Sequence, residues 1–207
     1  MSVNEVTDSI KDLNIQDKKN EINKNENIKN KGTGAGGSNT NKNGLTYEKE
    51  KDLSSEYEVI ERMQICEKIR FKSSPNKTLI TGKKSEFKKY LKSSESDIPD
   101  FIRKGIHGTK RPDKWFISDN NIFIVELKFQ QGGGSVCEKL QTPMQKIRNL
   151  KDRYPGKKIH YIYGLHEWFR ENCEADIYYL EKDKIPIFWG DDKDFKQKVI
   201  NYIISNL

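Results

Sequence analysis

The stretch RPDKWFISDNNIFIVELKF, residues 111–129, predicts a β-hairpin that decides the fold. Two apolar runs, WFI and IFIVELKF, flank the four residues SDNN, whose composition is typical of a turn. If SDNN is a four-residue loop, Ile117 pairs with Ile122, and each step outward pairs the next two residues until Asp113 faces Glu126. A loop one residue longer or shorter breaks this register and turns Asp113 to the other face.

The charges of this hairpin lie where a buried strand normally carries apolar residues. Two carboxylates opposite each other destabilise a sheet, so Asp113 and Glu126 need a positive partner. Lys128 shares the face of Glu126, because strand side chains alternate. A divalent ion would complete the charge balance, and carboxylates with water suit Mg²⁺, with Mn²⁺ as a substitute. The alternative is an edge strand on which Glu126 and Lys128 simply face solvent.

Taken as a set, the three residues predict hydrolysis of a phosphodiester. Asp113 and Glu126 would hold the metal against a phosphate, where the metal polarises the phosphoryl oxygen and lowers the pKa of a bound water. Lys128 would orient that water or help to deprotonate it, and would offset the developing negative charge.

The charge of the chain is concentrated in one segment. The 207 residues carry a net charge of +7, yet residues 62–114 alone hold fifteen Lys or Arg against six Asp or Glu. A local excess of this kind favours an anionic partner, with nucleic acid first. The residues expected to neutralise phosphates are Lys83, Lys84, Lys88, Lys89 and Arg111.

The N-terminal residues 1–43, rich in Asn and Lys, are expected to form an arm that is flexible until bound, followed by one domain over 44–207. Glycines in residues 31–44 argue against a stable helix or strand. This segment is either a linker or a loop that approaches a polyanion, and Asn39, Asn41, Lys42 and Asn43 carry groups suited to base edges. A partial apolar stripe predicts a helix over 45–70, with Glu48 in its first turn, where the helix dipole favours an acid.

The second half of the chain alternates between predicted helices and strands. A helix is expected to begin near Thr142 with Pro143 at its first position. A strand over 157–165, a short helix over 166–173, one or two strands within 175–190 and an amphipathic helix over 192–207 follow. This pattern predicts an α/β protein with a mixed sheet.

The three cysteines are widely spaced and form no CxxC, which predicts reduced intracellular thiols, with neither a disulfide framework nor a zinc site. No apolar run approaches the roughly 18 residues that span a bilayer. The N-terminus shows no basic region followed by an apolar block, so no secretory signal is expected. We therefore expect an intracellular protein without a membrane partner, cytoplasmic in a prokaryote or inside the host cell if viral.

Pro112-Asp113 and Glu126-Leu127-Lys128 resemble the two halves of the motif of the PD-(D/E)xK nuclease superfamily. Around them, HGTKRPD, IVELKFQQGGGSVCEKLQT, HYIYGLHEWF and IPIFWG are similar to a group of type II restriction endonucleases. The similarity extends from about residue 81 to 190. The chain departs from the pattern at Cys137, where an acidic residue is expected before Glu138.

The resemblance implies a restriction-endonuclease-like αβββαβ core, a mixed central sheet flanked by helices, dependence on Mg²⁺, double-stranded DNA as substrate and a homodimer. GGSNTNKNGLTYE resembles the Gly/Asn loop and helix start that carry a glutamate into the metal site of such enzymes, which assigns that role to Glu48. Gln145 corresponds to a polar residue near the site, and Glu138 is a second candidate near it. The loop after the catalytic strand is expected to read DNA through Gln130, Gln131 and Ser135.

Three functions remain open at this point. The first is a site-specific type II restriction endonuclease. The second is a structure-specific nuclease on the same core, such as a Holliday-junction resolvase or a nicking repair enzyme. The third is a DNA-binding protein without catalysis.

Overall fold

One seven-stranded sheet organises the chain. The computed structural model describes residues 38–91, 111–132 and 137–207, with side chains from residue 42 onward. The strands, which lie side by side in chain order, are β1 (Tyr57–Arg62), β2 (Glu67–Phe71), β3 (Ser74–Thr81), β4 (Lys114–Ile117), β5 (Asn121–Lys128), β6 (Lys158–Leu165) and β7 (Ile187–Trp189). Strands β1 to β5 run antiparallel, whereas β5, β6 and β7 are parallel. The predicted α/β class with a mixed sheet is therefore confirmed.

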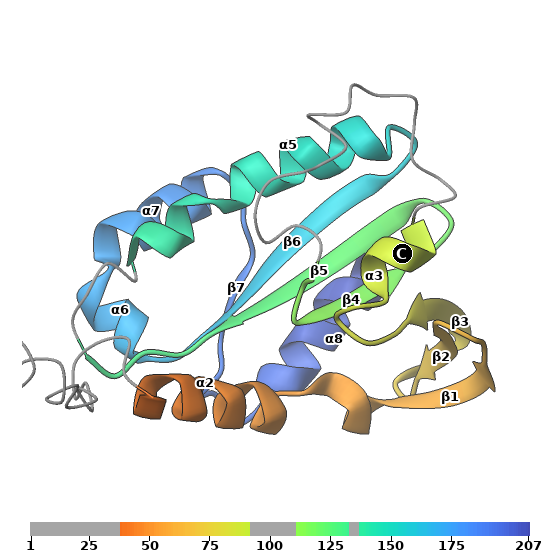
Figure 1. Cartoon of the computed structure of the whole chain (residues 1–207), viewed down its shortest axis with the longest axis horizontal. Coiled ribbons are helices and arrows are strands. Elements are labelled where there is room, and N and C mark those ends of the chain that lie inside the picture. The colour runs from red at the N-terminus through yellow and green to blue at the C-terminus, as the bar shows by residue number, and fades with distance from the viewer. Residues whose placement is uncertain (1–37, 92–110, 133–136) are drawn as a thin grey trace, which may run out of the picture.

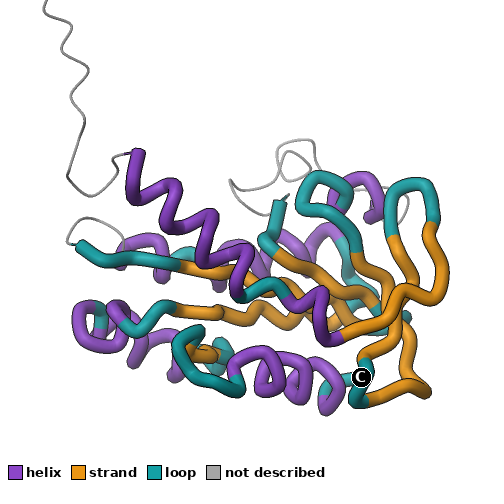
Figure 2. The backbone as a smooth tube through the Cα atoms, turned by 90° about the horizontal axis from the view of Figure 1, so that it is seen from below, coloured by secondary structure: helices purple, strands orange, loops and turns teal. Residues whose placement is uncertain are grey.

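Helices cover both faces of this sheet (Figure 1, and from below in Figure 2). They are α2 (Ser38–Glu50), α3 (Phe87–Leu91), α5 (Pro143–Arg153), α6 (Trp168–Asn172), α7 (Glu174–Lys182) and α8 (Phe195–Ser205), with short 3₁₀ turns η1 (Leu53–Glu56) and η3 (Cys137–Gln141). Alternate residues of β5 supply two cores, because strand side chains point to opposite faces. Ile122 and Ile124 join the core that includes α5, while Phe123 and Val125 join the core that includes α8.

The β4–β5 hairpin has the register that the sequence predicts. Ile117 pairs with Ile122, and the ladder continues outward to Lys114 opposite Val125. Asp113 lies one residue beyond this ladder, and its Oδ2 accepts a hydrogen bond of 2.8 Å from the backbone N–H of Leu127. Strand β5 lies between β4 and β6 and is buried along almost its whole length. The alternative of an exposed edge strand is therefore wrong.

The N-terminal part of the domain differs from the prediction. The helix expected over 45–70 ends at Glu50, and the antiparallel pair β1–β2 takes its place. The apolar stripe behind that prediction is only partly buried, since Leu53 is 1% exposed but Ile60 is 47% exposed at an irregularity of the ladder. The segment YEVIER is rich in aromatic and β-branched residues, which fit a strand better than a helix.

Helix α2 begins at Ser38, so the prediction of irregular structure up to residue 44 is wrong from that residue on. Gly44 lies inside the helix, and the expected domain boundary at 43/44 falls within it. The intrinsic cost of glycine in a helix is about 1 kcal/mol, and the packing of Tyr47, only 4% exposed, against the rest of the domain outweighs it.

The second half of the chain follows the predicted order with one exception. Helix α5 begins at Pro143, and β6, α6 and α8 lie where the sequence predicts them. Of the one or two strands expected within 175–190, only β7 is present, and the first part of that stretch forms α7 instead. Strands β6 and β7 are parallel neighbours, so the chain between them must return along the sheet. Helices α6 and α7 form this connection. In the part of the chain that is described, no helix is long and apolar enough to cross a membrane.

Candidate active site

The carboxyl ends of the three parallel strands meet beneath helix α2. The Tyr47 ring of this helix lies 5.4 Å from that of Phe129, directly after β5, and 5.9 Å from that of His166, directly after β6. Gly190 directly follows the third strand, β7, and a Cβ added there would stand 1.8 Å from the Tyr47 hydroxyl. The carboxyl ends of parallel strands are a common place for ligands, and this packing brings the next residue, Glu48, to that edge.

Two carboxylates meet at this place, and a third lies on β5. Glu48 and Asp113 line one cavity of about 290 Å³ together with Lys84. Glu126 lies on the adjacent strand, and its side chain, like that of Asp113, is only 11% exposed. The Oε2 atom of Glu126 is buried and has no hydrogen-bond partner among the described residues. A buried carboxylate oxygen without a donor is costly unless a cation satisfies it.

Three lysines neutralise these acids. Lys84, in the loop after β3, places its Nζ 2.5 Å from Glu48 Oε2 and 2.6 Å from Asp113 Oδ1. Lys128 Nζ lies 2.7 Å from Glu126 Oε1, as expected for two residues on one face of a strand. Lys146, on α5, lies 3.8 Å from the same Glu126 oxygen. Both ammonium groups thus share Oε1 and leave Oε2 to another partner.

Burial and charge perturb the pKa values of these groups in opposite directions. Burial alone lowers the pKa of Lys84, but its hydrogen bonds to Asp113 and Glu48 outweigh burial and raise the pKa above its ordinary value. The pKa of Lys146 is lowered because burial outweighs the attraction of Glu126. Burial, reinforced by the nearby Glu126 charge, raises the pKa of Tyr161 far above its ordinary range. Perturbed groups gathered in this way are typical of functional sites.

The donor set fits Mg²⁺. Magnesium prefers oxygen ligands and is usually held by one or two carboxylates with several waters. Asp113, directly before β4, and Glu126, on β5, supply such oxygens, and the Oε2 of Glu126, which has no donor among the described residues, is suited to accept a cation. Glu48 can add a third carboxylate from α2, because Lys84 links it to Asp113.

Lys146 and Tyr161 belong to the site and were missed in the sequence. Lys146 Nζ donates a hydrogen bond of 2.8 Å to the Tyr161 hydroxyl, and both side chains are buried. Gln145, predicted near the site, is exposed on α5. The signal was the position of Lys146 on the apolar stripe of the helix, between Pro143 and Leu150, where a charged residue requires a buried partner.

Two of the residues predicted to read DNA contact each other. Asn43 Nδ2 donates a hydrogen bond of 3.3 Å to Gln131 Oε1, which links α2 to the loop after β5 across 88 positions. Gln130 is buried, and its amide donates to the Gly132 carbonyl at 2.6 Å. Lys42 is exposed on α2. The side chains of Asn39 and Asn41, and all of Ser135, lie outside the described residues.

The predicted phosphate contacts divide into two groups. Those that are exposed are Lys83, Lys88, Lys89 and Arg111. Lys84 differs, because its ammonium contacts two carboxylates of the site.

Glu138 is exposed on η3.

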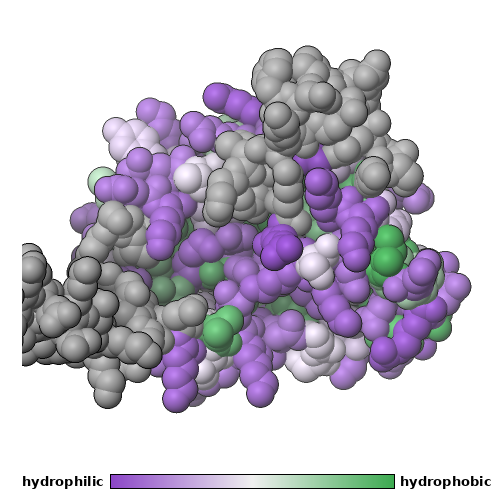
Figure 3. All heavy atoms as spheres, in the orientation of Figure 1, coloured by the Kyte–Doolittle hydropathy of each residue, from purple (hydrophilic) through white to green (hydrophobic). Residues whose placement is uncertain are grey.

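An open cleft of about 560 Å³ lies beside the carboxylates. Asp113 and Lys84 line both this cleft and the smaller cavity next to Glu48, so they stand where the two spaces meet. Arg62, Lys83 and Lys114 also line the cleft. Hydrophilic side chains dominate the face of the molecule seen in Figure 3.

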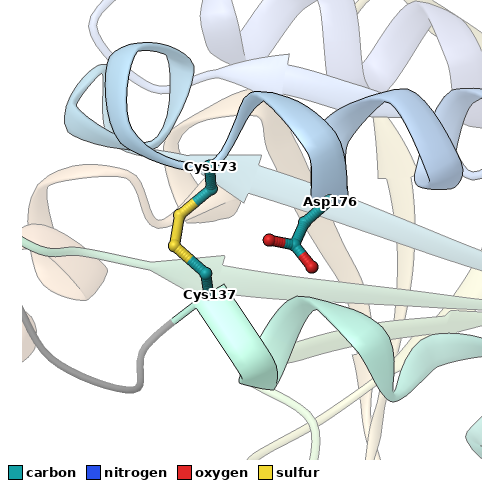
Figure 4. Close-up of side chains that lie close together, drawn as sticks. All are labelled: Cys137, Cys173 and Asp176. Atoms are coloured by element: carbon teal, nitrogen blue, oxygen red, sulfur yellow. A yellow bond between two sulfur atoms is a disulfide. The ribbon is translucent and has the colours of Figure 1, made fainter.

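A second group with ligand atoms close together lies apart from the carboxylates. The Cys137 and Cys173 sulfurs are joined as a disulfide, with Asp176 beside them (Figure 4). The expectation of reduced thiols alone is corrected here, because the chain from β6 through α6 brings the two Cα atoms to 5.7 Å. Sulfurs bonded to each other are not thiolate ligands, and Gln141 donates a hydrogen bond to Asp176. This group therefore does not supply a magnesium site.

Comparisons of the chain with family models, with curated proteins and with solved structures found no match.

Proposed function

We propose that this protein is a Mg²⁺-dependent type II restriction endonuclease that hydrolyses phosphodiester bonds at a short specific sequence in double-stranded DNA. The observation that carries the proposal is that Lys84 joins Glu48 to Asp113, and that Glu126 on β5 has a buried Oε2 with no hydrogen-bond partner among the described residues. Lys128, on the same strand as Glu126, contacts the Glu126 carboxylate. This is the arrangement that the resemblance to PD-(D/E)xK nucleases implies.

The order of the central elements supports the proposal. The series α2, β3, β4, β5, α5, β6, with the short helix α3 between β3 and β4, has an element order compatible with an αβββαβ core. The pair β1–β2 is then an insertion between the first helix and the first core strand. Helix α2 and the loop after β5, joined by Asn43 and Gln131, lie beside the carboxylates and are the proposed DNA-reading elements. Such enzymes commonly act as homodimers, and we extend that proposal to this chain.

The residues have distinct roles in the proposed reaction. Asp113, Glu126 and Glu48 would hold Mg²⁺, which supplies polarisation of the phosphoryl oxygen and a water of lowered pKa when bound. Asp113 is oriented by the Leu127 N–H, so its carboxylate has a defined direction. Lys128 orients the attacking water and offsets negative charge that develops on the phosphate. Lys146 lies 3.8 Å from the Glu126 oxygen that Lys128 contacts, so it shares the neutralisation of that carboxylate with Lys128.

Plasmid digestion tests the proposal. Incubation of the full chain with a sequenced circular plasmid and Mg²⁺ is expected to give a fixed set of fragments, and none with EDTA. Asp113→Asn should lower the cleavage rate by at least about a hundredfold, because a metal ligand and its charge are lost. Asp119→Asn is the matched control, since Asp119 is exposed in the turn of the same hairpin and far from the site along the strands.

Each alternative has its own outcome. Cleavage of four-way junctions with linear duplex left whole would replace the proposal with a structure-specific nuclease. Binding of DNA without cleavage in Mg²⁺ or Mn²⁺ would replace it with a non-catalytic DNA-binding protein. Undiminished cleavage by a folded Asp113→Asn protein, checked by circular dichroism, would show that the site is wrongly assigned.

A further inference from the structure

The ammonium of Lys84 stands between two carboxylates that belong to distant parts of the chain. It contacts Glu48 of α2 at 2.5 Å and Asp113 of the hairpin at 2.6 Å, while Lys84 itself follows β3. Two carboxylates this close repel each other without a cation between them. A single positive group therefore holds three elements of the site together.

The oxygens of the site are unequally available to a metal ion. Asp113 Oδ2 accepts the Leu127 N–H, and Asp113 Oδ1 accepts Lys84. Glu126 Oε2, in contrast, has no donor among the described residues. A divalent ion can therefore bind Glu126 Oε2 directly, but at Asp113 Oδ1 it must replace the Lys84 ammonium.

We propose that Lys84 is a resident cation that occupies the metal position at Asp113 and is displaced when the divalent ion binds. This inference rests on the proposed metal-dependent function and adds its regulation: metal binding exchanges one cation for another. The released ammonium turns toward the open cleft that Lys84 also lines, where it can contact a phosphate of bound DNA.

The loop that carries Lys84 is suited to an exchange of the side chain alone. The Trp115 indole N–H donates a hydrogen bond of 3.2 Å to the Lys83 carbonyl. A Cβ at Gly82 would lie 2.9 Å from the same indole ring, so the backbone is packed tightly against a buried residue. The Lys84 side chain, in contrast, is 43% exposed. The backbone stays in place while the ammonium moves.

Calorimetric titration of the full chain with Mn²⁺, without DNA, tests the exchange. In Lys84→Met the ammonium that competes with Mn²⁺ is absent. The Kd for Mn²⁺ is therefore expected to fall by about tenfold or more, because a unit charge and a divalent ion repel each other strongly at contact distance. Lys83→Met is the matched control, because it removes an equal charge from the same loop but from an exposed side chain. Its Kd should stay within about twofold of the wild type, as expected for a screened surface charge.

A second measurement needs no variant. Acetylation of the wild-type amines, followed by peptide mass mapping, should show Lys84 more reactive in saturating Mn²⁺ than in EDTA, with Lys83 unchanged. Equal or weaker Mn²⁺ binding by Lys84→Met, or lower Lys84 reactivity in Mn²⁺, would overturn the exchange. If either result is obtained while the wild type still binds Mn²⁺ and cleaves DNA, the proposed function stands without the exchange. Absence of Mn²⁺ binding in both proteins would remove the metal-dependent function as well.

Discussion

The contact between Gly190 and Tyr47 determines how helix α2, and with it Glu48, docks on the sheet. In Gly190→Ala the new Cβ would lie 1.8 Å from the Tyr47 hydroxyl and 2.7 Å from Cζ, where real Cβ atoms stay beyond 3.0 Å. The ring has little space to move, since it is 4% exposed and packs on Phe129 and His166. We expect the substitution to lower the free energy of unfolding by about 2–3 kcal/mol, near the upper end for overpacking.

A double-mutant cycle isolates the cause of this loss. The Tyr47 hydroxyl is buried and has no hydrogen-bond partner among the described residues, so Tyr47→Phe should be neutral or stabilising by about 1 kcal/mol. In the Tyr47→Phe background the nearest clash is gone, and Gly190→Ala should cost about 1 kcal/mol less than in the wild type. Metal affinity should fall in Gly190→Ala and recover in the double variant, because Glu48 follows Tyr47.

Urea denaturation followed by far-ultraviolet circular dichroism measures all four proteins of the cycle. An equal cost of Gly190→Ala in both backgrounds would refute the contact with the hydroxyl. A cost below about 0.5 kcal/mol in the wild-type background would refute the close packing of α2 itself, since that is the range of ordinary surface changes.

Two further predictions concern buried basic groups. His160 lies between Asn121 and Tyr202, and burial lowers its pKa from 6.5 to about 4. The unfolded chain then binds a proton more readily than the folded one. Stability present above pH 6.5 is therefore lost as the pH falls through 4, by up to about 3 kcal/mol. Denaturation at pH 7 and pH 4.5 should show a smaller loss of stability for His160→Gln than for the wild type, and an equal loss would contradict the assignment. Lys146→Met should change the free energy of unfolding by less than about 1 kcal/mol, because loss of the bond to Tyr161 is offset by relief of ammonium burial. Its cleavage rate should nevertheless fall about tenfold or more, because Lys128 alone must then neutralise Glu126, and full activity in the plasmid assay would remove Lys146 from the site.

The hairpin was predictable because its determinants are local. Alternation, turn composition and loop length fix which residues pair, and the ladder from Ile117–Ile122 outward is the predicted one. The start of α5 at Pro143 was predictable for the same reason, since proline is suited to the first helical position.

The errors arise where tertiary packing decides between local alternatives. The segment around Tyr57 carries apolar residues at helical spacing, but its β-favouring residues together with its partner β2 select the strand. Helix α7 forms despite its aromatic, β-favouring residues because a parallel sheet requires a return path between β6 and β7. Gly44 lies in a helix because Tyr47, three residues on, is anchored against Gly190.

The sequence by itself determined the face shared by Glu126 and Lys128 and the register that brings Asp113 beside β5, because strand periodicity and turn geometry act over a few residues. Only the tertiary structure decided which distant groups complete the site. Lys84 and Lys146 come from a loop 29 residues before Asp113 and from a helix on one face of the sheet. Their contacts depend on how elements pack, and packing depends on the whole chain at once.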